Sequence, residues 1–353
     1  MPDSEQYPVI LLEQERKLEL EDECLGVVVE ESLDGIYRCE LSFRAYDAAK
    51  GYLYMDRKLL DFGQELTLRL GGTEAADTLF TGKITGIEAE FVFGRDPPAV
   101  LTVLAEDALQ GLRLTRRTRT FEDMTDAAIM QDIAGKYGLS ADVSIEGDPH
   151  KVMVQVNQSD LAFLRERARA VGAELWIGDG KLAVKPRTDR SSGDPLTLIF
   201  GADLVEFRGL ADLAGQRTSL NVTGWDVTQK AAIAQKADKA ALSAELSGQK
   251  SGPELLDELG TYNEQLVHAG PVTDAEATAV AEAFFKRRAR RFVTGRGMAD
   301  GDVRIRVGTQ VELQSLGPLF TGTYYVVETR HVYDPDAGYR TYFRVERPGI
   351  AGG

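Results

Sequence analysis

The sequence reads FGQELTLRLGG at residues 62–72 and LFTGKITGIEAEF at 79–91, and it reads VGTQVELQSLG at 307–317 and LFTGTYYVVETRH at 319–331. Both copies place Gly and Gln before an alternating strand, then a Gly-rich turn, then the tetrapeptide Leu-Phe-Thr-Gly leading into another strand. A loop deletion must be assumed in the second copy, where the gap is shorter. Such self-similarity indicates two domains of one fold, although chance convergence of short strand–turn–strand stretches would give the same pattern.

The first 110 residues are patterned as strands. Leu25–Glu31 and Tyr37–Arg44 bracket Asp34-Gly35, which predicts a hairpin with a two-residue turn that places Cys39 opposite Glu30. Further expected strands have alternating polarity, with bulges at two glycines of the second one: residues 65–70, 79–93 (Gly82 and Gly86) and 100–105. Short strands without a long intervening helix predict a barrel or sandwich.

The periodicity then changes to that of helices. Residues 121–139 predict one helix with Asp123 as its N-cap and Gly138 at its end. Residues 159–172 predict a second helix, capped by Ser159 and ended by Gly172. A hairpin turning at Gly178-Asp179-Gly180 follows, so a small α/β module is expected over residues 116–190.

Strands resume at Leu204–Arg208 and Thr218–Asp226, and a largely helical segment is then expected over residues 229–293. That segment is rich in Ala and Lys at its start, and its last helix begins with the capping box Thr273–Glu276. Gly295–Gly301 is interpreted as a flexible return into strands that continue to Arg347.

The predicted fold class is therefore α+β and mainly β, with two related β-barrel domains, an inserted α/β module and a helical insertion. Four parts are expected: a first barrel at 1–115, the module at 116–190, a second barrel at 191–228 and 294–348, and the insertion at 229–293.

Composition excludes several classes of protein. With 353 residues, 43% hydrophobic and 27% charged, the chain is expected to fold into two or three globular domains. A formal net charge of −15 argues against nucleic-acid binding. The longest apolar runs fall short of the roughly 20 residues of a membrane-spanning helix, and the first 20 residues lack a basic region before an apolar core, so no secretory signal is expected. Cys24 and Cys39 are expected to be free thiols in a reducing compartment.

No catalytic, cofactor or metal site is predicted. The three histidines, at positions 150, 268 and 331, are far apart in sequence, and His331 is expected to be structural. Motifs for zinc proteases, nucleophile elbows, phosphate loops and paired cysteines do not occur. Asp334–Gly338 superficially resembles a calcium loop, but Val345 stands where a bidentate Glu is required, so a hairpin turn is expected.

One basic cluster is a candidate partner contact: Lys286, Arg287, Arg288, Arg290 and Arg291. These cations would complement the dipole at a helix C-terminus as a solvated face. The functional interpretation is an electrostatic contact with an acidic neighbouring subunit or tube protein.

Several of these stretches together resemble the late control gene D family of contractile phage tails, which includes the N-terminal hub region of VgrG proteins and the hub of the T-even baseplate. The resemblance runs from about residue 15 to about residue 348 and is carried by residues 121–139, 155–186, 224–226 and 319–349. The run Gln155–Leu164 is its strongest part, joined to Gly322-x-Tyr324 and Gly338-Tyr339.

The resemblance implies a non-enzymatic baseplate hub: a homotrimer with pseudo-six-fold symmetry that joins a hexameric inner tube to a trimeric spike. VgrG chains continue beyond the hub region, whereas this sequence ends at Gly353, so the spike is expected as a separate chain. A tape-measure protein and a baseplate wedge are further candidate partners, and nucleic acid and membrane are not. The expected location is the cytoplasm during assembly and then a virion tail or an extracellular injection particle.

Two other functions remain open from the residues alone. A cell-wall hydrolase would use a pair of carboxylates in a cleft, and the 56 acidic residues leave that possible. A glycan-binding adhesin of such a particle is the other alternative.

Overall fold

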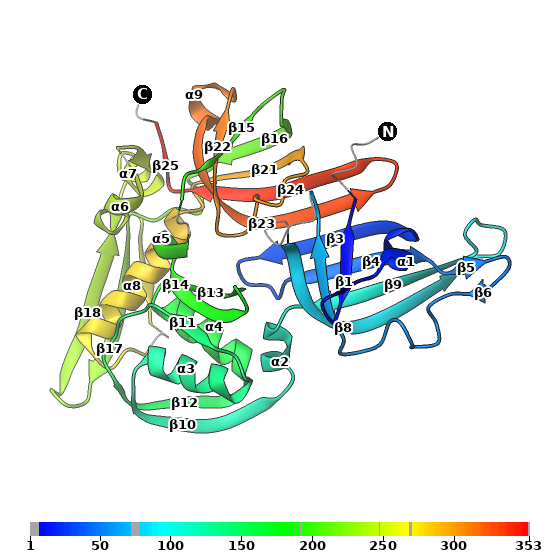
Figure 1. Ribbon diagram of the computed structural model, residues 1–353. Coiled ribbons are helices and arrows are strands. Elements are labelled where there is room, and N and C mark those ends of the chain that lie inside the picture. Colours follow the sequence, from blue (N-terminus) through cyan, green and yellow to red (C-terminus); the bar gives the residue numbers. More distant parts are fainter. Residues whose placement is uncertain (1–6, 72–77, 191–192, 247, 268–269, 352–353) are drawn as a thin grey trace.

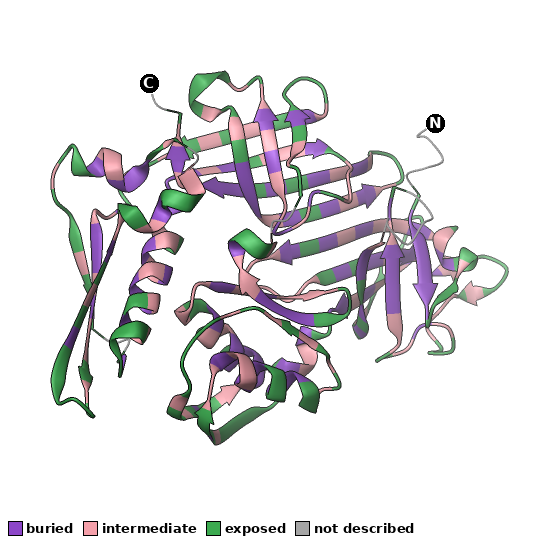
Figure 2. Cartoon of the chain, turned by 60° about the vertical axis from the view of Figure 1, so that its left-hand side comes forward, coloured by how far each residue is buried: buried purple, intermediate pink, exposed green. Residues whose placement is uncertain are grey.

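A single large β-sheet organises the molecule (Figure 1). The computed structural model describes residues 7–71, 78–190, 193–246, 248–267 and 270–351. In the described part of the chain the sheet has 13 strands in the order β16-β21-β24-β23-β3-β4-β9-β8-β7-β1-β2, and β22 joins β15 to β23. Purple buried segments alternate with exposed ones along these strands (Figure 2), as expected for strands that bury one face.

The two ends of the chain supply matching sets of strands. The first set comprises β1 (Val9–Leu12), β3 (Cys24–Ser32), β4 (Arg38–Arg44), β7 (Glu65–Arg69), β8 (Thr78–Phe91) and β9 (Ala99–Glu106). The second comprises β15 (Leu196–Ile199), β16 (Leu204–Ala211), β21 (Val293–Asp300), β22 (Gln310–Gln314), β23 (Gly322–Asp334) and β24 (Gly338–Arg347).

Both sets pair in the same order. In the first half β1, β7, β8, β9, β4 and β3 are successive neighbours, and in the second half β15, β22, β23, β24, β21 and β16 are successive neighbours. One pairing differs in direction, since β1 is antiparallel to β7 whereas β15 is parallel to β22. Antiparallel pairing of β23 with β3 joins the halves into one sheet.

Irregularities of the strands also coincide. A register shift between Ile84 and Gly86 in β8 has its counterpart between Val326 and Glu328 in β23. Another in β3, between Cys24 and Gly26, matches the one in β16 between Leu204 and Glu206. Because a bulge is a specific feature of a strand, these two coincidences show that β3, β4, β8 and β9 are equivalent to β16, β21, β23 and β24; the direction of β15 and the register shift at Leu68 in β7 are where the halves differ.

The tetrapeptides that suggested the duplication are not themselves equivalent. Gly82 pairs with Leu66 inside a strand, whereas Tyr324 occupies the corresponding position opposite Val311. The second Leu-Phe-Thr-Gly begins in the short helix α9 (Gly317–Phe320) and enters the strand only at Gly322. The prediction of a repeat was therefore right about the strands and wrong by two residues about their alignment.

The first hairpin has a longer loop than predicted. Five residues, 33–37, connect β3 to β4, and Cys39 lies opposite Val29 instead of Glu30. Asp107 holds the end of this loop, because its carboxylate accepts a hydrogen bond from the Tyr37 N–H at 3.0 Å. Both cysteines are free, as predicted, and both are buried.

The segment predicted as an α/β module has that composition and its own core. It contains β10 (Arg116–Met124), α3 (Asp126–Lys136), β11 (Ala141–Val143), β12 (His150–Ser159), α4 (Asp160–Ala170), β13 (Ala173–Gly178), β14 (Lys181–Pro186) and α5 (Arg187–Arg190). Ser159 caps α4 as predicted, but Thr125 rather than Asp123 caps α3. Asp123 instead lies at the end of β10.

Residues 229–293 are not a purely helical insertion. They contain β18 (Ala231–Asp238), η3 (Lys239–Leu242), α6 (Ser243–Leu246), β19 (Lys250–Ser251), α7 (Gly252–Asp257), β20 (Asn263–Leu266) and α8 (Asp274–Ala289). The Ala-rich start forms β18 because it pairs along its whole length with β17 (Ser219–Asp226), and Ile233 and Ala237 then pack under α8. Helix propensity is a weak preference that such pairing overrides.

The glycines at 295 and 297 belong to a central strand, β21, and not to a flexible return. A Cβ on Gly295 would lie 2.3 Å from the ring of Phe207, so the absent side chain is what lets that ring pack across the sheet. The glycine-rich pattern therefore marks a close approach between strand and ring.

Short elements complete the fold: β2 (Glu15–Arg16), α1 (Leu18–Glu21), β5 (Tyr46–Asp47), β6 (Gly51–Tyr52), α2 (Leu109–Arg113) and β25 (Gly349–Ile350). In the ranges that the structure describes, none of the helices combines the length and apolar character needed to span a bilayer.

Candidate functional site

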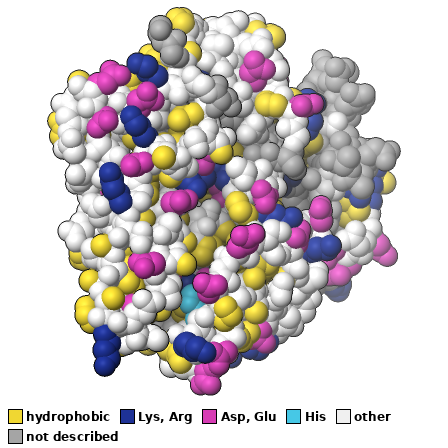
Figure 3. All heavy atoms as spheres, turned by 90° about the vertical axis from the view of Figure 1, so that its left-hand side faces the viewer, with side chains coloured by type: hydrophobic (Ala, Val, Ile, Leu, Met, Phe, Trp, Pro, Cys, Tyr) yellow, Lys and Arg dark blue, Asp and Glu magenta, His cyan; other side chains and the backbone are white. Residues whose placement is uncertain are grey.

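An arginine-lined cleft of about 760 Å³ lies between the large sheet and the helices beside it. Nine arginines and four acidic residues line it: Arg165, Arg169, Arg187, Arg208, Arg287, Arg290, Arg291, Arg296, Arg344, Asp34, Glu174, Glu328 and Glu346. This excess of basic groups contrasts with the chain's formal net charge of −15. Basic and acidic side chains are interspersed on the face shown in Figure 3.

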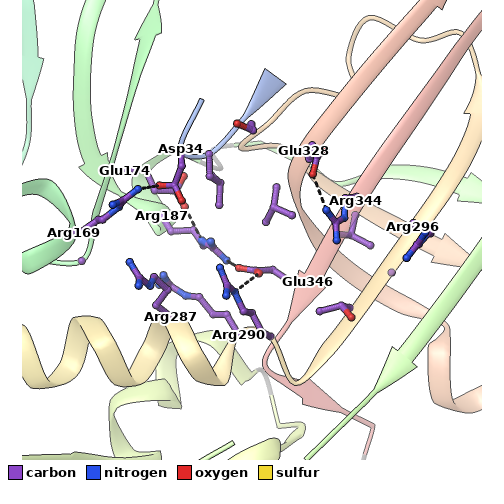
Figure 4. A pocket seen from close by; sticks show the side chains of 18 of the residues that line it. Asp34, Arg169, Glu174, Arg187, Arg287, Arg290, Arg296, Glu328, Arg344 and Glu346 are labelled. Carbon is purple, nitrogen blue, oxygen red and sulfur yellow. Dashed lines mark hydrogen bonds and ion pairs between the residues drawn. The ribbon is translucent and has the colours of Figure 1, made fainter. Parts of the chain in front are cut away.

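The arginines enter the cleft from two sides (Figure 4). Arg169 of α4, Arg187 of α5 and Arg287 of α8 come from the helical side. Arg296 of β21 and Arg344 of β24 come from the sheet, where they pair with each other across adjacent strands. Arg208 of β16 pairs with Arg296 in turn, so three guanidinium groups stand side by side on one face of the sheet.

The predicted basic cluster divides between different surroundings. Arg287 and Arg291 are exposed and line the cleft. Lys286 and Arg288 lie outside it, paired with Glu282 and Glu264. Arg290 is buried and donates two hydrogen bonds of 2.8 Å to Glu245. The prediction of one solvated basic face is therefore wrong for Arg290, whose guanidinium group is buried in an ion pair with Glu245.

Each acidic side chain of the cleft has an arginine partner. Glu174 accepts hydrogen bonds from Arg187 and Arg190 at 2.9 and 3.1 Å, and Arg187 also donates to Glu346 at 2.6 Å. Burial opposes the charged form of Glu174, but the two guanidinium groups hold its pKa below the ordinary glutamate value. These bonds connect the α/β module to strand β24.

The positive charges of other arginines in the cleft are less fully balanced by acidic neighbours. Although Arg287 is exposed, the protein around it removes part of its hydration, which lowers the pKa of Arg287, and the nearby Arg169 lowers that pKa further. Burial likewise lowers the pKa of Arg165, whose Nε and Nη2 atoms are buried without a hydrogen-bond partner among the described residues. Guanidinium groups in this state favour the approach of carboxylates, which they bind through two parallel hydrogen bonds.

The cleft is suited to electrostatic contact rather than to acid–base chemistry. Neither histidine nor cysteine occurs among the described residues that line it. Asp34 lies 2.8 Å from Arg169 and Glu328 lies 3.1 Å from Arg344, so these carboxylates are also neutralised by ion pairs.

The other residues considered from sequence have structural roles. His331 is fully buried, with Nδ1 2.8 Å from the Tyr339 hydroxyl and Nε2 3.0 Å from the Ile305 carbonyl. His150 lies 3.3 Å from Asp126 inside the module, and His268 is outside the described residues. Asp334 caps the β23–β24 turn, accepting hydrogen bonds from the N–H groups of Asp336 and Ala337.

A family model described as the Alg8 N-terminal domain matches residues 9–334. The chain belongs to this family. No curated protein matches the sequence of this family member. Its fold, however, is shared by several solved structures.

A 43 kDa tail protein of prophage MuSo2 from Shewanella oneidensis aligns with a TM-score of 0.70 and 14% identity, covering 97% of this chain and 98% of that one. The tail protein from Neisseria meningitidis MC58 gives 0.68 and 12%, covering 98% and 97%. A component of the type VI secretion system of E. coli gives 0.57 and 13%, covering 94% and 76%. These similarities establish the fold as that of tail proteins.

Sequence reasoning found only part of the cleft. Arg287 and Arg291 were recognised because they stand in a dense basic run. Arg208, Arg296 and Arg344 lie on three different strands without a dense basic run, and only the registers of these strands bring them together. Alternation along each strand would have indicated their outward orientation, but not which strands are neighbours.

Proposed function

We propose that this chain is a structural hub subunit of a contractile phage tail or a related injection system. Three copies form a ring with pseudo-six-fold symmetry, which joins a hexameric inner tube to a trimeric spike. The observation that carries the proposal is the equivalence of the two halves, which extends to strand order, register and bulges.

The duplication allows a trimer to match a six-fold partner. Three chains with two equivalent halves present six similar units to a six-fold partner, while the chain count stays three for a spike on the opposite side. In this proposal the halves are tube-type β-barrel domains at 1–115 and at 191–228 with 294–348. The module at 116–190 and the mixed α/β insertion at 229–293 lie outside the barrels.

The names of the similar structures support this role. Two of them are tail proteins, and the E. coli type VI component is described as similar to the bacteriophage T4 tail proteins gp27 and gp5. Another similar chain, with a TM-score of 0.53, comes from a complex of PdpA with VgrG in Francisella. By analogy, the hub assembles in the cytoplasm and resides in a virion tail or an injection particle, where it transmits force without catalysis.

The cleft supplies a contact surface in this proposal. Arg287 and Arg291 face an acidic surface of a neighbouring tube or baseplate protein, because both are exposed and the cleft around them has more basic than acidic groups. Charge complementarity of this kind directs assembly and fixes orientation.

The decisive experiment measures stoichiometry. Native mass spectrometry of the chain alone, with the tube protein, and with the spike protein is expected to give three copies per complex. Cryo-electron microscopy of the parent particle should show six equivalent halves around the channel. A single copy per particle, or cell-wall hydrolysis that depends on one acidic residue of this chain, would overturn the proposal.

A further inference from the structure

Two strand edges of the large sheet are open within the chain. Among the residues that the structure describes, β16 pairs as a strand only with β21, apart from a single bridge between Leu204 and Phe200, and the Gly86–Phe91 part of β8 pairs only with β9. Exposed strand edges carry free backbone N–H and C=O groups that readily pair with another strand. Neither edge contains proline, which would block such pairing.

The internal junction shows what these edges can bind. Residues Glu328–Tyr333 of β23 pair antiparallel with Val27–Ser32 of β3, and this pairing joins the second half to the first. Strand β8 is the equivalent of β23, and β16 is the equivalent of β3. The two open edges are therefore the counterparts of the two strands that already pair inside the chain.

We propose that β8 of one copy pairs antiparallel with β16 of the next copy, repeating the internal junction between subunits. This inference rests on the proposed function for the number of copies in the ring, which is three, and adds how neighbouring copies contact each other. It makes the eight-strand path from β16 to β8 continuous from copy to copy.

The equivalence also fixes the register. The shared bulges place Gly86 at the position of Glu328, and Leu204 at the position of Cys24. Transferring the internal register then gives six pairs between subunits: Gly86–Asp212, Ile87–Ala211, Glu88–Leu210, Ala89–Gly209, Glu90–Arg208 and Phe91–Phe207.

One face of this pairing is apolar. Ile87, Ala89 and Phe91 occupy the positions of Thr329, His331 and Tyr333, which are buried at the internal junction. Phe91 is 58% exposed in the single chain and would meet Phe207 in the transferred register. Pairing would thus remove an exposed aromatic side chain from water, as expected at the core of a protein interface.

The opposite face is charge-complementary. The guanidinium group of Arg208 makes no hydrogen bond or ion pair with another described residue, and Arg208 stands beside Arg296, which stands beside Arg344. Like charges opposite each other destabilise neighbouring strands. Glu90 from the next copy would relieve this repulsion, much as Arg330 pairs with Glu30 at 3.2 Å across the internal junction. Among the described residues of a single chain, the Glu90 carboxylate forms an ion pair only with the exposed Arg95 of the following loop.

These observations favour a second copy over an unrelated strand. The edge strand of an unrelated protein could also pair with the free backbone groups. It would not be expected to place a glutamate opposite Arg208 and an aromatic ring opposite Phe207 in one register, as β8 does. The contact is head-to-tail, so it closes into a ring or grows into a filament according to the rotation between copies.

A charge swap tests the pairing. Glu90→Arg and Arg208→Glu should each weaken self-association on the order of fivefold at every interface, and the double variant should restore it. Lys58→Glu, on an exposed loop, has the same charge change as Arg208→Glu and should leave self-association unchanged. Analytical ultracentrifugation measures the association constants, and circular dichroism checks that each variant is folded.

Cysteine cross-linking tests the register. The double variant Glu90→Cys/Arg208→Cys should form a disulfide between chains on oxidation, and Glu88→Cys/Arg208→Cys, two residues out of register, should react much more slowly. Glu90→Cys alone should give no disulfide-linked dimer. A dimer from that single variant would show that β8 pairs with itself and would overturn the inference.

The outcomes separate this inference from the proposed function. A trimer that forms with neither charge rescue nor register-specific cross-linking overturns the strand pairing and leaves the hub intact. Filaments with the expected cross-links support the pairing and overturn the three-copy ring. A chain that stays monomeric with every tube and spike protein tested overturns both.

Discussion

Single polar residues in the interior show how the sheet accommodates groups that could titrate. Each ring nitrogen of His331 has a hydrogen-bonding neighbour. The Ile305 carbonyl can only accept, so Nε2 carries the proton and Nδ1 accepts from the Tyr339 hydroxyl. Burial lowers the pKa of His331 to about 4, and the nearby charge of Glu31 opposes that shift only in part.

This shift predicts acid sensitivity. The unfolded chain binds a proton at His331 near pH 6.5, whereas the folded chain binds it only near pH 4, so stability is fully present above pH 6.5 and is lost as pH falls through that window. Replacing His331 with Gln, which can make similar hydrogen bonds, should abolish this contribution. Urea unfolding at pH 7 and pH 4 should show the wild type losing about 3 kcal/mol more than His331→Gln. Equal losses in the two proteins would contradict the prediction.

Glu31 belongs to a buried ion pair that ties the halves together. Its carboxylate accepts hydrogen bonds from Arg306 and from the Val307 N–H at 3.0 Å. Burial opposes its ionisation, but Arg306 holds the pKa of Glu31 below the ordinary value.

Glu31→Ala should therefore lower the free energy of unfolding by about 3 kcal/mol, because the partly buried Arg306 loses its carboxylate partner and the buried Val307 N–H loses its acceptor. The adjacent Glu30 is a matched control, since its ion pair with Arg330 is about half exposed. Glu30→Ala should cost about 1 kcal/mol or less. Chemical denaturation of both variants measures the difference, and equal costs would show that burial of the pair is not what matters.

At the scale of elements, the two halves fill equivalent positions with different side chains. Gly295 makes room for the ring of Phe207 and Gly209 makes room mainly for the ring of Phe320, whereas the first half has Cys39, Val29 and Val27 at the positions of Gly295, Gly209 and Phe207. Two glycines and a large ring thus stand where the first half has three side chains of intermediate size. The side-chain pattern differs while the strand pairing is kept, so the duplication is faint in the sequence and clear in the strand pairing.

Gly295→Ala should consequently be destabilising by about 1–3 kcal/mol, because its new methyl group would overlap the ring of Phe207. Gly135 in α3 is the control, since a Cβ there meets no atom within 4 Å. Gly135→Ala should stabilise the protein by about 0.5–1 kcal/mol through higher helix propensity. Thermal unfolding of both variants checks the opposite signs. A neutral Gly295→Ala would mean that the ring can move aside.

Elements with local signals could be predicted from sequence, and elements set by distant partners could not. Ser159 and Gly172 bound α4 as expected, because a cap and a left-handed glycine act within a few residues. Strand β18 was mistaken for helix because its partner β17 and its cover α8 determine its conformation. The same limit applies to the cleft, whose arginines meet only through the strand registers.

At the scale of the whole molecule, the sequence indicated two similar halves, and the structure adds how they are joined. The internal β23–β3 junction could not be predicted, because it pairs residues about 300 positions apart. It also leaves β8 and β16 as open edges at the two ends of a continuous path. Each chain therefore folds by itself but leaves these two strand edges without a partner strand.

The arginine cleft gives a prediction at this largest scale. Arg287→Glu/Arg291→Glu should leave folding intact, because Arg287 has no ion pair in the described residues and Arg291 lies 4.0 Å from Glu346 with 66% of its side chain exposed. Incorporation of the variant into particles should nevertheless be lost, since four units of charge change where an acidic partner is expected. Purified particles from cells that produce only the variant would be assayed for the hub by immunoblot.

Two controls distinguish contact from folding. Lys58→Glu/Lys151→Glu makes the same charge change at exposed sites away from the cleft and should assemble normally. Arg290→Glu should instead lower the melting temperature, because it places a buried carboxylate beside Glu245. If the Arg287/Arg291 variant assembles as well as the wild type at physiological and at low salt, then the cleft is not a partner contact, because weak screening at low salt would make an electrostatic defect largest.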